Sequence, residues 1–395
     1  MLQTRAVLWD HSLRDTGPAT RSRGERAPDP EIQIGRMDTA EAADLARDPE
    51  VLMMTPVMPI TLIAPFDEPG PAPTGAATWG VSAVGAAATG LTGAGVKVAV
   101  LDTGIDATHP AFAGMSLVQR DFTATGDGDG NGHGTHCAGT IFGSDVDGTR
   151  IGVAPGVTDA LIGKVLADDG SGSSEMIFSA ISWAAEAGAD VISMSLGFDF
   201  PGLVERLIDA GWPADLATSA ALEGYRGNLR MFDALMDLVR ARAAFGSGTL
   251  VIAAAGNESR RGENPDFEIA AGLPAAATGV ISVAAAGEDP AGWRIADFSN
   301  TFATITGPGV NILSANAGGG LRALRGTSMA CPHVAGVAAL LWEQVRGEAV
   351  PRNAATVEAR LRSRAKTTGF APGTQVPDRG LGMVSVGSGQ GATIS

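Results

Sequence analysis

From about residue 79 onward, short apolar runs alternate with longer segments of mixed polarity. The runs contain few polar residues, as expected of strands that are buried on both faces of a sheet. They span residues 96–101, 159–165, 190–194, 249–255 and 280–285. Segments with a helical spacing of apolar residues lie between them, at residues 134–142, 174–187, 229–245 and 328–345. This alternation predicts an α/β fold with a mostly parallel central sheet flanked by helices, formed by residues 79–395.

The pattern differs before residue 79. Residues 1–30 are polar and rich in proline, which predicts a loose tail. Residues 31–64 predict a small unit with a strand at 31–37, a helix at 39–47 and a strand at 51–58, and Asp38 and Glu41 form a capping box where the helix begins. Residues 65–78 contain several prolines and glycines and predict a linker. Because so small a unit cannot bury a core of its own, we expect it to lean on the larger domain.

Composition narrows the class of protein. The chain has 395 residues, with 28 Lys and Arg against 43 Asp and Glu, so its formal net charge is −15. Nucleic acids and anionic membrane surfaces attract basic faces, and this balance argues against both as partners. Residues 70–96 carry no charge and are long enough to span a bilayer, but prolines and glycines interrupt them. Turns and a short helix are therefore expected there.

The N-terminus and the cysteines bear on the compartment. The first residues lack the apolar run of a secretory signal, which favours a cytoplasmic location. Secretion is not excluded, because a misassigned start codon would give the same appearance. The two cysteines, Cys137 and Cys331, cannot form a disulfide framework.

Three polar residues stand at the ends of predicted buried elements. Asp102 follows the strand at residues 96–101, where a carboxylate is costly to bury without a partner. His133 lies between two glycines that leave its ring open, and Ser328 begins a long apolar helix. Each has an ordinary alternative: a turn cap, a structural histidine and a helix N-cap. Together they supply the carboxylate, the base and the nucleophile that serine catalysis requires.

Two further segments follow buried strands. The side-chain amide of Asn257 could donate to a developing oxyanion, although a turn residue is the ordinary interpretation. The segment Ser195-Leu196-Gly197 could offer its backbone to an extended peptide.

Three motifs resemble those of the subtilisin-like serine proteases. Asp102-Thr103-Gly104 resembles the aspartate motif of that family, and His133-Gly134-Thr135-His136 resembles its histidine motif. Residues 326–333, which read Gly-Thr-Ser-Met-Ala-Cys-Pro-His, resemble its serine motif. The order Asp, His, Ser along the chain is also the subtilisin order. The resemblance covers about residues 79–390 and implies the subtilisin-like fold.

The resemblance implies a serine endopeptidase that acts on proteins or peptides. Ser328 would attack the peptide carbonyl, His133 would take its proton, and Asp102 would orient His133. Asn257 and the backbone N–H of Ser328 would form the oxyanion hole. The implied substrate-binding residues are Ser195, Leu196, Gly197, Ala254, Ala255 and Gly256. Gly256 would leave room for a large apolar residue before the scissile bond. Such catalysis needs no cofactor; structural calcium is common in the family, and no metal ligands are assigned.

The resemblance also bears on the N-terminal region. Many members of the family carry an N-terminal prosegment that assists folding, inhibits the enzyme and is then removed. Residues 31–64 resemble a shortened prosegment, so we expect a self-processed precursor that is cut within about residues 60–79. Its own N-terminal segment would be an intramolecular inhibitor or chaperone.

Residues 198–246 depart from the simplest pattern of the family. They contain helical segments at 203–210, 214–224 and 229–245, where a single connecting helix is usual. Two interpretations are open for this insertion: a surface elaboration packed on the domain, or a lid or wall beside the substrate cleft.

The spacing of the motifs also predicts where the two cysteines lie. Cys137 follows His133 by four residues and Cys331 follows Ser328 by three, so each thiol should lie one helical turn inside its catalytic residue. We expect two buried, reduced thiols that are near neighbours beneath the site. A disulfide or redox control is the alternative.

Other classes of protein fit less well. An aspartic protease needs two Asp-Thr-Gly motifs, and the second one here, at Asp15, lies in the polar tail. A dinucleotide-binding protein needs G-x-G-x-x-G after a strand, and the sequence lacks it. Residues 127–132 resemble the start of a calcium loop, but Ala138 occupies the position that requires glutamate. A catalytically inactive binding or chaperone module on the same fold is the remaining alternative to an enzyme.

Overall fold

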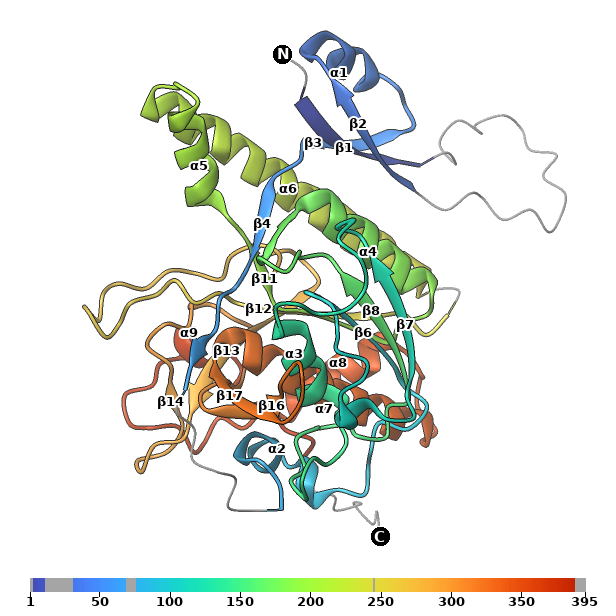
Figure 1. Ribbon diagram of the computed structural model, residues 1–395, viewed down its shortest axis with the longest axis vertical. Coiled ribbons are helices and arrows are strands. Elements are labelled where there is room, and N and C mark those ends of the chain that lie inside the picture. The colour runs from blue at the N-terminus through green and yellow to red at the C-terminus, as the bar shows by residue number, and fades with distance from the viewer. Residues whose placement is uncertain (1–2, 11–30, 69–75, 244–245, 388–395) are drawn as a thin grey trace, which may run out of the picture.

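The architecture was obtained as a computed structural model that describes residues 3–10, 31–68, 76–243 and 246–387. Its centre is an eight-stranded sheet with strand order β14-β13-β12-β10-β6-β8-β7, in which β15 lies beside β13 (Figure 1). The strands are β6 (Lys97–Asp102), β7 (Ser116–Asp121), β8 (Asp159–Lys164), β10 (Val191–Met194), β12 (Leu250–Ala254), β13 (Val280–Gly287), β14 (Arg294–Ile295) and β15 (Ile305–Pro308). All neighbouring pairs are parallel except β13 with β14. The predicted α/β fold is confirmed.

The strand order reverses direction at β6. The next strands along the chain, β7 and β8, lie on one side of β6, and β10, β12 and β13 lie on the other. A parallel sheet opens a crevice beyond the carboxyl end of its strands at such a reversal, because the connecting segments leave in opposite directions. Asp102, the last residue of β6, therefore lies at the crevice where a functional site is expected.

Helices cover both faces of the sheet, and apolar residues fill the two layers between them. One face carries α2 (Trp79–Ala83), α3 (His133–Phe142) and α7 (Thr327–Arg346), with α8 (Ala354–Ser363) packed on α7. The other face carries α4 (Ser174–Glu186) and α6 (Ala214–Arg242). Phe178 of α4 and Phe232 of α6 meet edge to face with ring centroids 4.9 Å apart. In the described part of the chain, no helix combines the length and the apolar character needed to cross a membrane.

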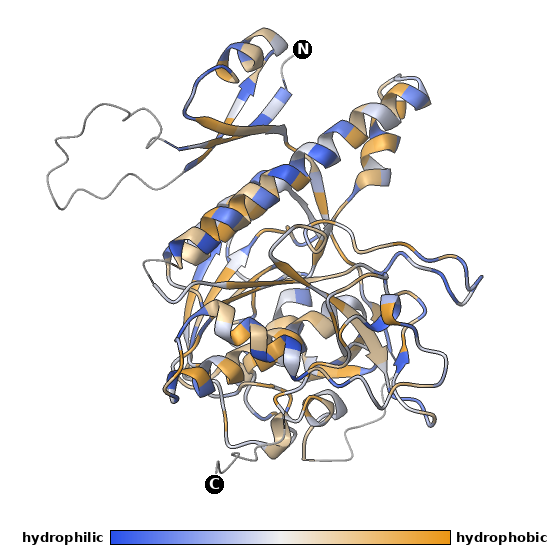
Figure 2. Cartoon of the chain, turned by 180° about the vertical axis from the view of Figure 1, so that it is seen from behind, coloured by the Kyte–Doolittle hydropathy of each residue, from blue (hydrophilic) through white to orange (hydrophobic). Residues whose placement is uncertain are grey.

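The insertion differs from its predicted form. It consists of α5 (Phe200–Asp209) and the single long helix α6, whereas the sequence predicts separate helices at 214–224 and 229–245 (Figure 2). Gly224 and Gly227 suggest an interruption of the helix, but α6 is continuous, and the two glycines allow it to pack closely against residues 55–58. A Cβ atom at Gly227 would lie 2.4 Å from Oγ1 of Thr55, and one at Gly224 would lie 3.3 Å from Sδ of Met58.

The N-terminal unit contains one more strand than the sequence predicts. Residues 1–30 are predicted to be a loose tail, but β1 (Gln3–Trp9) is the central strand of an antiparallel sheet between β2 (Glu31–Met37) and β3 (Val51–Pro56). The short run Ala6-Val7-Leu8 explains this difference, because all three residues are buried. Residues 11–30 lie outside the described residues. The capping box of α1 (Thr39–Leu45) is present, with Asp38 and Glu41 in the predicted roles.

Residues 57–68, which we call the strap, cross the large domain from the N-terminal unit. Strand β4 (Pro59–Leu62) pairs antiparallel with β9 (Ser171–Ser173) on one side and with β11 (Leu196–Phe198) on the other. Strand β5 (Phe66–Asp67) pairs with β17 (Leu321–Arg325), which also pairs with β16 (Ile312–Ala315). The prediction of a linker at 65–78 is therefore wrong for residues 66–67, while residues 69–75 lie outside the described residues.

Candidate active site

Asp102 and His133 form a buried pair at the carboxyl end of β6. Oδ1 of Asp102 lies 2.7 Å from Nδ1 of His133 and accepts a second hydrogen bond, 2.8 Å long, from the backbone N–H of Thr103. Both side chains are at most 2% exposed. Two acceptor contacts compensate for the burial of the carboxylate, and they fix the orientation of the imidazole.

Glycines allow the two chain segments that carry this pair to approach each other. A Cβ atom at Gly134, next to His133, would lie 2.2 Å from the carbonyl oxygen of Gly104. A Cβ atom at Gly104 would lie 2.0 Å from the carbonyl oxygen of Gly128, and Gly104 has a positive φ of 110°. Side chains at these positions would separate the strand end from the helix start.

Asp129 ties these segments together at the start of α3. Its Oδ1 accepts from the hydroxyl of Thr103 and from the backbone N–H of Gly132, each at 2.8 Å. Its Oδ2 accepts from the backbone N–H and the hydroxyl of Thr135, at 2.8 and 2.6 Å. A carboxylate at a helix N-terminus satisfies free N–H groups and opposes the helix dipole. Asp129 thus holds the first turn of α3, and with it His133, against the end of β6.

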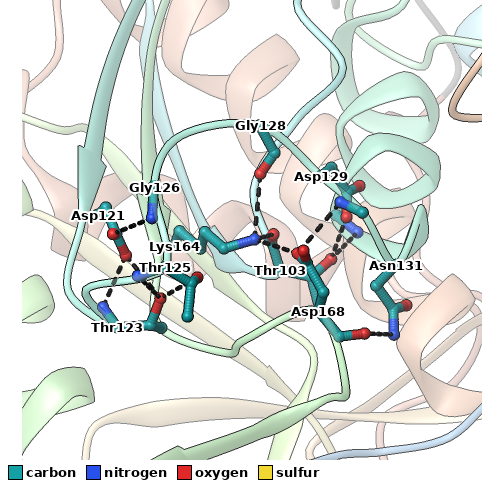
Figure 3. Close-up of polar contacts among 12 residues, drawn as sticks. Thr103, Asp121, Thr123, Thr125, Gly126, Gly128, Asp129, Asn131, Lys164 and Asp168 are labelled. Carbon is teal, nitrogen blue, oxygen red and sulfur yellow. Dashed lines mark hydrogen bonds and ion pairs between the residues drawn. The ribbon is translucent and has the colours of Figure 1, made fainter.

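The ammonium group of Lys164 extends this network beneath the same loop (Figure 3). Its Nζ donates to the carbonyl oxygens of Thr103 and Gly128, at 2.8 and 3.2 Å, and to Asp168 at 2.5 Å. The hydrogen bond from Lys164 lowers the pKa of Asp168 below its ordinary value. Asp168 in turn accepts from the backbone N–H of Gly130, so the loop that precedes His133 is fixed at several points.

Ser328 is the second residue of α7, and Pro332 determines the surroundings of its carbonyl group. Proline has no N–H to donate to the carbonyl four residues earlier. That carbonyl belongs to Ser328, and it accepts instead from the hydroxyl of Ser195 at 3.1 Å and from the thiol of Cys137 at 3.4 Å. The proline therefore lets two neighbouring elements anchor the residue that carries the candidate nucleophile.

The side-chain amide of Asn257 has a fixed orientation. Its Oδ1 accepts from the backbone N–H and the hydroxyl of Thr327, at 2.9 and 2.8 Å. Its Nδ2 consequently points the other way and donates to the carbonyl oxygen of Ala64 in the strap, at 3.1 Å. The amide is thus a directed donor beside Ser328, as an oxyanion donor must be.

The strap lies directly on these groups. The hydroxyl of Ser328 donates to the carbonyl oxygen of Ile63 at 3.0 Å. Nε2 of His133 is buried and has no hydrogen-bond partner among the described residues. In this state the hydroxyl is therefore bonded to the strap and not to the imidazole.

The predicted substrate-binding residues surround the strap. Leu196 and Gly197 pair with Leu62 and Thr61 as parts of β11 and β4. A cavity of about 600 Å³ extends beside Ile63, and its lining includes Gly197, Ala254, Ala255 and Gly256. Ser195 is not part of that lining and contacts Ser328 instead. The insertion contributes Phe200, Leu222 and Tyr225 to the cavity wall, a contribution that the sequence left open.

Two further histidines frame the site. Burial, followed by the nearby charge of His133, lowers the pKa of His136 to about 3, and burial lowers the pKa of His333 to about 4. His136 uses Nε2 toward the carbonyl oxygens of Ile312 and Arg322, and His333 uses Nδ1 toward that of Met329. Both are neutral at physiological pH. His136 connects α3 to β16 and β17, whereas the bond of His333 lies within α7.

Both cysteines are buried free thiols, as the first interpretation expects. Sγ of Cys137 lies 3.8 Å from Nδ1 of His133, and Sγ of Cys331 lies 3.5 Å from the hydroxyl of Ser193. Burial, followed by the charge of Asp102, raises the pKa of Cys137 well above its ordinary value. Asp102, His133 and Cys137 could together offer three metal ligands. However, the hydrogen bond between Asp102 and His133 already uses two of these atoms, and a protonated thiol is a poor ligand.

Sequence reasoning missed several residues of the site. The sequence shows Asp129 only within a loop that lacks the glutamate of a calcium site, and no sequence pattern indicates that Lys164 is a buried cation. The sequence predicts a cut within about residues 60–79 but does not identify Ile63 and Ala64 as the residues that contact the site. The run Leu62-Ile63-Ala64, which resembles an extended apolar substrate, was the available signal.

Comparison with known proteins identifies the class of this molecule. The sequence profile of the Subtilase family matches residues 93–385, and the chain belongs to that family. It is a subtilisin-like serine endopeptidase, a hydrolase whose substrates are proteins. It is 37% identical over 257 residues to an "Intracellular serine protease" of Paenibacillus polymyxa, a match that covers 63% of this chain and 67% of the relative. It is 36% identical over 265 residues to the "Major intracellular serine protease" of Bacillus subtilis (strain 168), covering 64% and 70%. It is 31% identical over 343 residues to "Subtilisin-like serine protease Pen c 1" of Penicillium citrinum, covering 81% and 73%.

Proposed function

We propose that this chain hydrolyses peptide bonds with Ser328 as nucleophile, His133 as general base and Asp102 as the carboxylate that orients the imidazole. Oγ of Ser328 attacks the carbonyl carbon of the substrate while Nε2 of His133 takes the hydroxyl proton. The imidazolium then gives this proton to the departing amine, which leaves an ester on Ser328. A water molecule attacks that ester by the same route, and the free serine is restored. The observation that carries the proposal is the hydrogen bond of 2.7 Å between Asp102 and His133 beside the buried start of α7.

The negative charge of the tetrahedral intermediate needs donors beside Ser328. We assign them to Nδ2 of Asn257 and the backbone N–H of Ser328 at the start of α7. The bonds from Thr327 to Oδ1 of Asn257 support this assignment, because they fix the amide before the reaction begins. Preorganised donors of this kind contribute roughly 10²–10³-fold to turnover.

The strap is proposed to be the intramolecular inhibitor of a precursor. It runs through the cleft in the place of an extended substrate, with β4 as the middle strand between β9 and β11. Because the hydroxyl of Ser328 reaches the carbonyl of Ile63, the bond between Ile63 and Ala64 is the one we expect to be cut. This bond lies within the range of 60–79 that the sequence suggests.

The positions of the two donors explain why the strap can inhibit before it is cut. Ser328 donates to the carbonyl of Ile63, whereas Asn257 donates to the carbonyl of Ala64, one residue further along. For rapid cleavage both groups must act on the same carbonyl. The strap must therefore shift before the chemistry can proceed, and this shift makes self-cleavage slow.

Catalysis of this kind proceeds without a cofactor, and we propose none. Structural calcium remains a proposal without assigned ligands, and a drop in Tm on addition of a chelator would support it. A cytoplasmic location is proposed because two relatives are named intracellular serine proteases. The net charge of −15 is the reason to expect neither nucleic acid nor an anionic membrane as partner.

A single experiment tests the catalytic and the precursor proposals. The full chain and Ser328→Ala are each purified, incubated with casein and with a fluorophosphonate, and analysed by mass spectrometry. We expect labelling at Ser328, casein cleavage and a new N-terminus at Ala64 in the unaltered chain only. Casein cleavage by Ser328→Ala would refute the triad. A fully active enzyme that retains Met1 would refute the precursor and leave the triad intact.

A further inference from the structure

The side of the cleft that follows the scissile bond carries two arginines of β17, and the strap engages both. Nε and Nη2 of Arg322 lie 3.1 and 2.5 Å from Oδ1 of Asp67. Nε of Arg325 lies 3.2 Å from Oε1 of Glu68. Among the described residues, neither guanidinium has a second carboxylate within ion-pair distance. After a cut at Ile63, residues 64–68 stay attached as the new N-terminus, and both cations lose their counter-charge when β5 detaches from β17.

Pairing between β5 and β17 fixes which side chains meet. Asp67 lies opposite Leu324, and Phe66 lies opposite Arg325. In an antiparallel pair, diagonal neighbours two residues away share a face. Arg322 therefore reaches Asp67 on one face. Arg325 reaches Glu68 on the other, where its guanidinium carbon also lies 5.1 Å from the centre of the Phe66 ring.

If the strap occupies the cleft as a substrate does, each of its residues corresponds to a numbered position of a substrate. This inference therefore rests on the proposed function. With the scissile bond after Ile63, Ala64 is the first residue beyond it. Asp67 and Glu68 are then the fourth and the fifth. When β5 leaves, β17 becomes an edge strand, and an incoming peptide can add to it through the same backbone groups.

We infer that Arg322 and Arg325 determine specificity by selecting substrates with acidic residues at the fourth and fifth positions after the scissile bond. The side chains of Arg322 and Arg325 are 46% and 43% exposed, so a substrate can reach them from solvent. The exposure also limits the effect, because an exposed ion pair changes an equilibrium by about fivefold at most. The two pairs together predict a preference of about tenfold in kcat/KM.

The test compares three internally quenched peptides with the common core Ile-Thr-Leu-Ile-Ala-Ala-Phe. They continue with Asp-Glu, Ala-Ala or Lys-Lys, and mass spectrometry checks that each is cut after the second isoleucine. The full chain is used, with its active sites titrated by a fluorophosphonate. We expect the Asp-Glu peptide to be cleaved about ten times faster than Ala-Ala, and Lys-Lys to be slowest. The preference should fall toward unity in 1 M NaCl, because salt screens exposed charges.

Variants separate the role of the arginines from a general effect of charge. Combined Arg322→Glu and Arg325→Glu should reverse the order toward Lys-Lys, and the combined Gln variants should abolish it. Arg362→Glu is the matched control, since this exposed arginine of α8 pairs with Glu358 and should leave the ratio unchanged. Only the ratio between peptides is compared within each variant, so a change in overall activity does not affect the conclusion.

The outcomes distinguish this inference from the proposed function. A p-nitroanilide of Ile-Thr-Leu-Ile has no residues after the scissile bond. If the unaltered chain does not cleave this anilide or label with the fluorophosphonate, the proposed function fails and the inference fails with it. If the anilide is cleaved but the three peptides react equally, or are cut at another bond, only the acidic preference is overturned.

Discussion

The catalytic core and the β5 end of the strap are held in place by different kinds of contact. In the core, Asp102, His133 and Ser328 are all at most 2% exposed, and each is fixed by bonds from neighbouring elements. On the strap, the side chain of Asp67 is 75% exposed and that of its partner Arg322 is 46% exposed. Buried contacts are strong and resist salt, whereas exposed pairs are weak and screened.

This difference matches what each region has to do. Groups that transfer a proton must stay within a fraction of an ångström of their working geometry, so excess constraint is useful there. A segment that must be released needs enough contacts to occupy the cleft. In the strap these contacts include the buried side chains of Ile60 and Ile63 as well as exposed contacts around β5. Backbone pairing with β9, β11 and β17, supplemented by exposed ion pairs, meets that need. Loss of a core contact should therefore change activity by orders of magnitude, and loss of a strap contact by much less.

The largest effect is expected from Ser328→Ala. Without the hydroxyl no acyl-enzyme forms, and turnover of a peptide substrate should fall by about 10⁶-fold. Turnover is measured with an internally quenched peptide, and mass spectrometry of the same sample should show an intact N-terminus. Ser363→Ala is the matched control, because that hydroxyl donates only to the carbonyl of Arg360 in the described structure. A loss of less than tenfold in Ser328→Ala would remove Ser328 from the mechanism.

Asp129→Ala should have the next largest effect, although Asp129 does not touch the substrate. Its removal leaves the N–H groups of Gly132 and Thr135 and the hydroxyl of Thr103 without their acceptor. The start of α3 can then move, and a shift of about 1 Å in His133 would lower kcat by about 10²-fold with little change in KM.

The control for this positioning role is close by. Asp121→Ala also removes a carboxylate, at the end of β7, but its bonds run to Thr123 and Gly126 and not to the segments of the pair. Asp129→Asn keeps one acceptor oxygen and should recover part of kcat. If Asp129→Ala changed KM and left kcat as it was, the carboxylate would not act through His133.

Sequence alone predicted the core far better than the strap, and the reason is physical. The strands and helices around Asp102, His133 and Ser328 are buried, so runs of apolar residues in the sequence predict them. Glycines in the motifs indicate where two segments lie close together. Strands β4 and β5 gain their conformation from partners about a hundred or more residues away, and no local pattern encodes such pairing. The same holds for Asp129 and Lys164, whose importance depends on which distant groups surround them.

The two buried histidines predict how the free energy of unfolding depends on pH. The pKa of His136 is about 3 and that of His333 about 4 in the folded chain, against about 6.5 when unfolded. Between pH 6.5 and about 4, only the unfolded chain binds these protons. The free energy of unfolding is therefore highest above pH 6.5 and decreases as the pH falls. The slope approaches about 1.4 kcal/mol per pH unit for each histidine.

Chemical denaturation between pH 7 and pH 4.5 measures this slope. The carboxylates of Asp106, Asp121 and Asp168 have pKa values below their ordinary range, so they contribute little in this window. Burial raises the pKa of Asp190, which opposes the histidine slope at the acid end, so the slope is compared between the unaltered chain and a histidine variant. His136→Gln retains a donor for the carbonyl of Ile312 and should lose about one proton from the slope. Stability that stayed level from pH 7 to pH 4.5 would contradict the buried neutral state of both rings.

Gly227→Ala should have the smallest effect on the reactivity of Ser328. It tests whether packing of α6 against β3 keeps the strap in the cleft. The added methyl would lie 2.4 Å from Oγ1 of Thr55, which also accepts a hydrogen bond from Nδ2 of Asn228. Strand β3 must then move away from α6, so the strap should leave the cleft more often. We expect a fluorophosphonate to label Ser328 several-fold faster, up to about tenfold for a loss of about 1.4 kcal/mol.

The same substitution has a second, opposite consequence that makes the result specific. Alanine favours a helix interior over glycine by about 1 kcal/mol, so α6 itself should become more stable. Faster labelling together with an undiminished Tm therefore points to weaker docking and not to a damaged domain. Gly347→Ala, where a Cβ atom would meet nothing closer than 3.6 Å, is the matched control and should leave labelling unchanged. If Gly227→Ala raised the Tm and left the labelling rate as it was, the long helix would not hold the strap in the cleft.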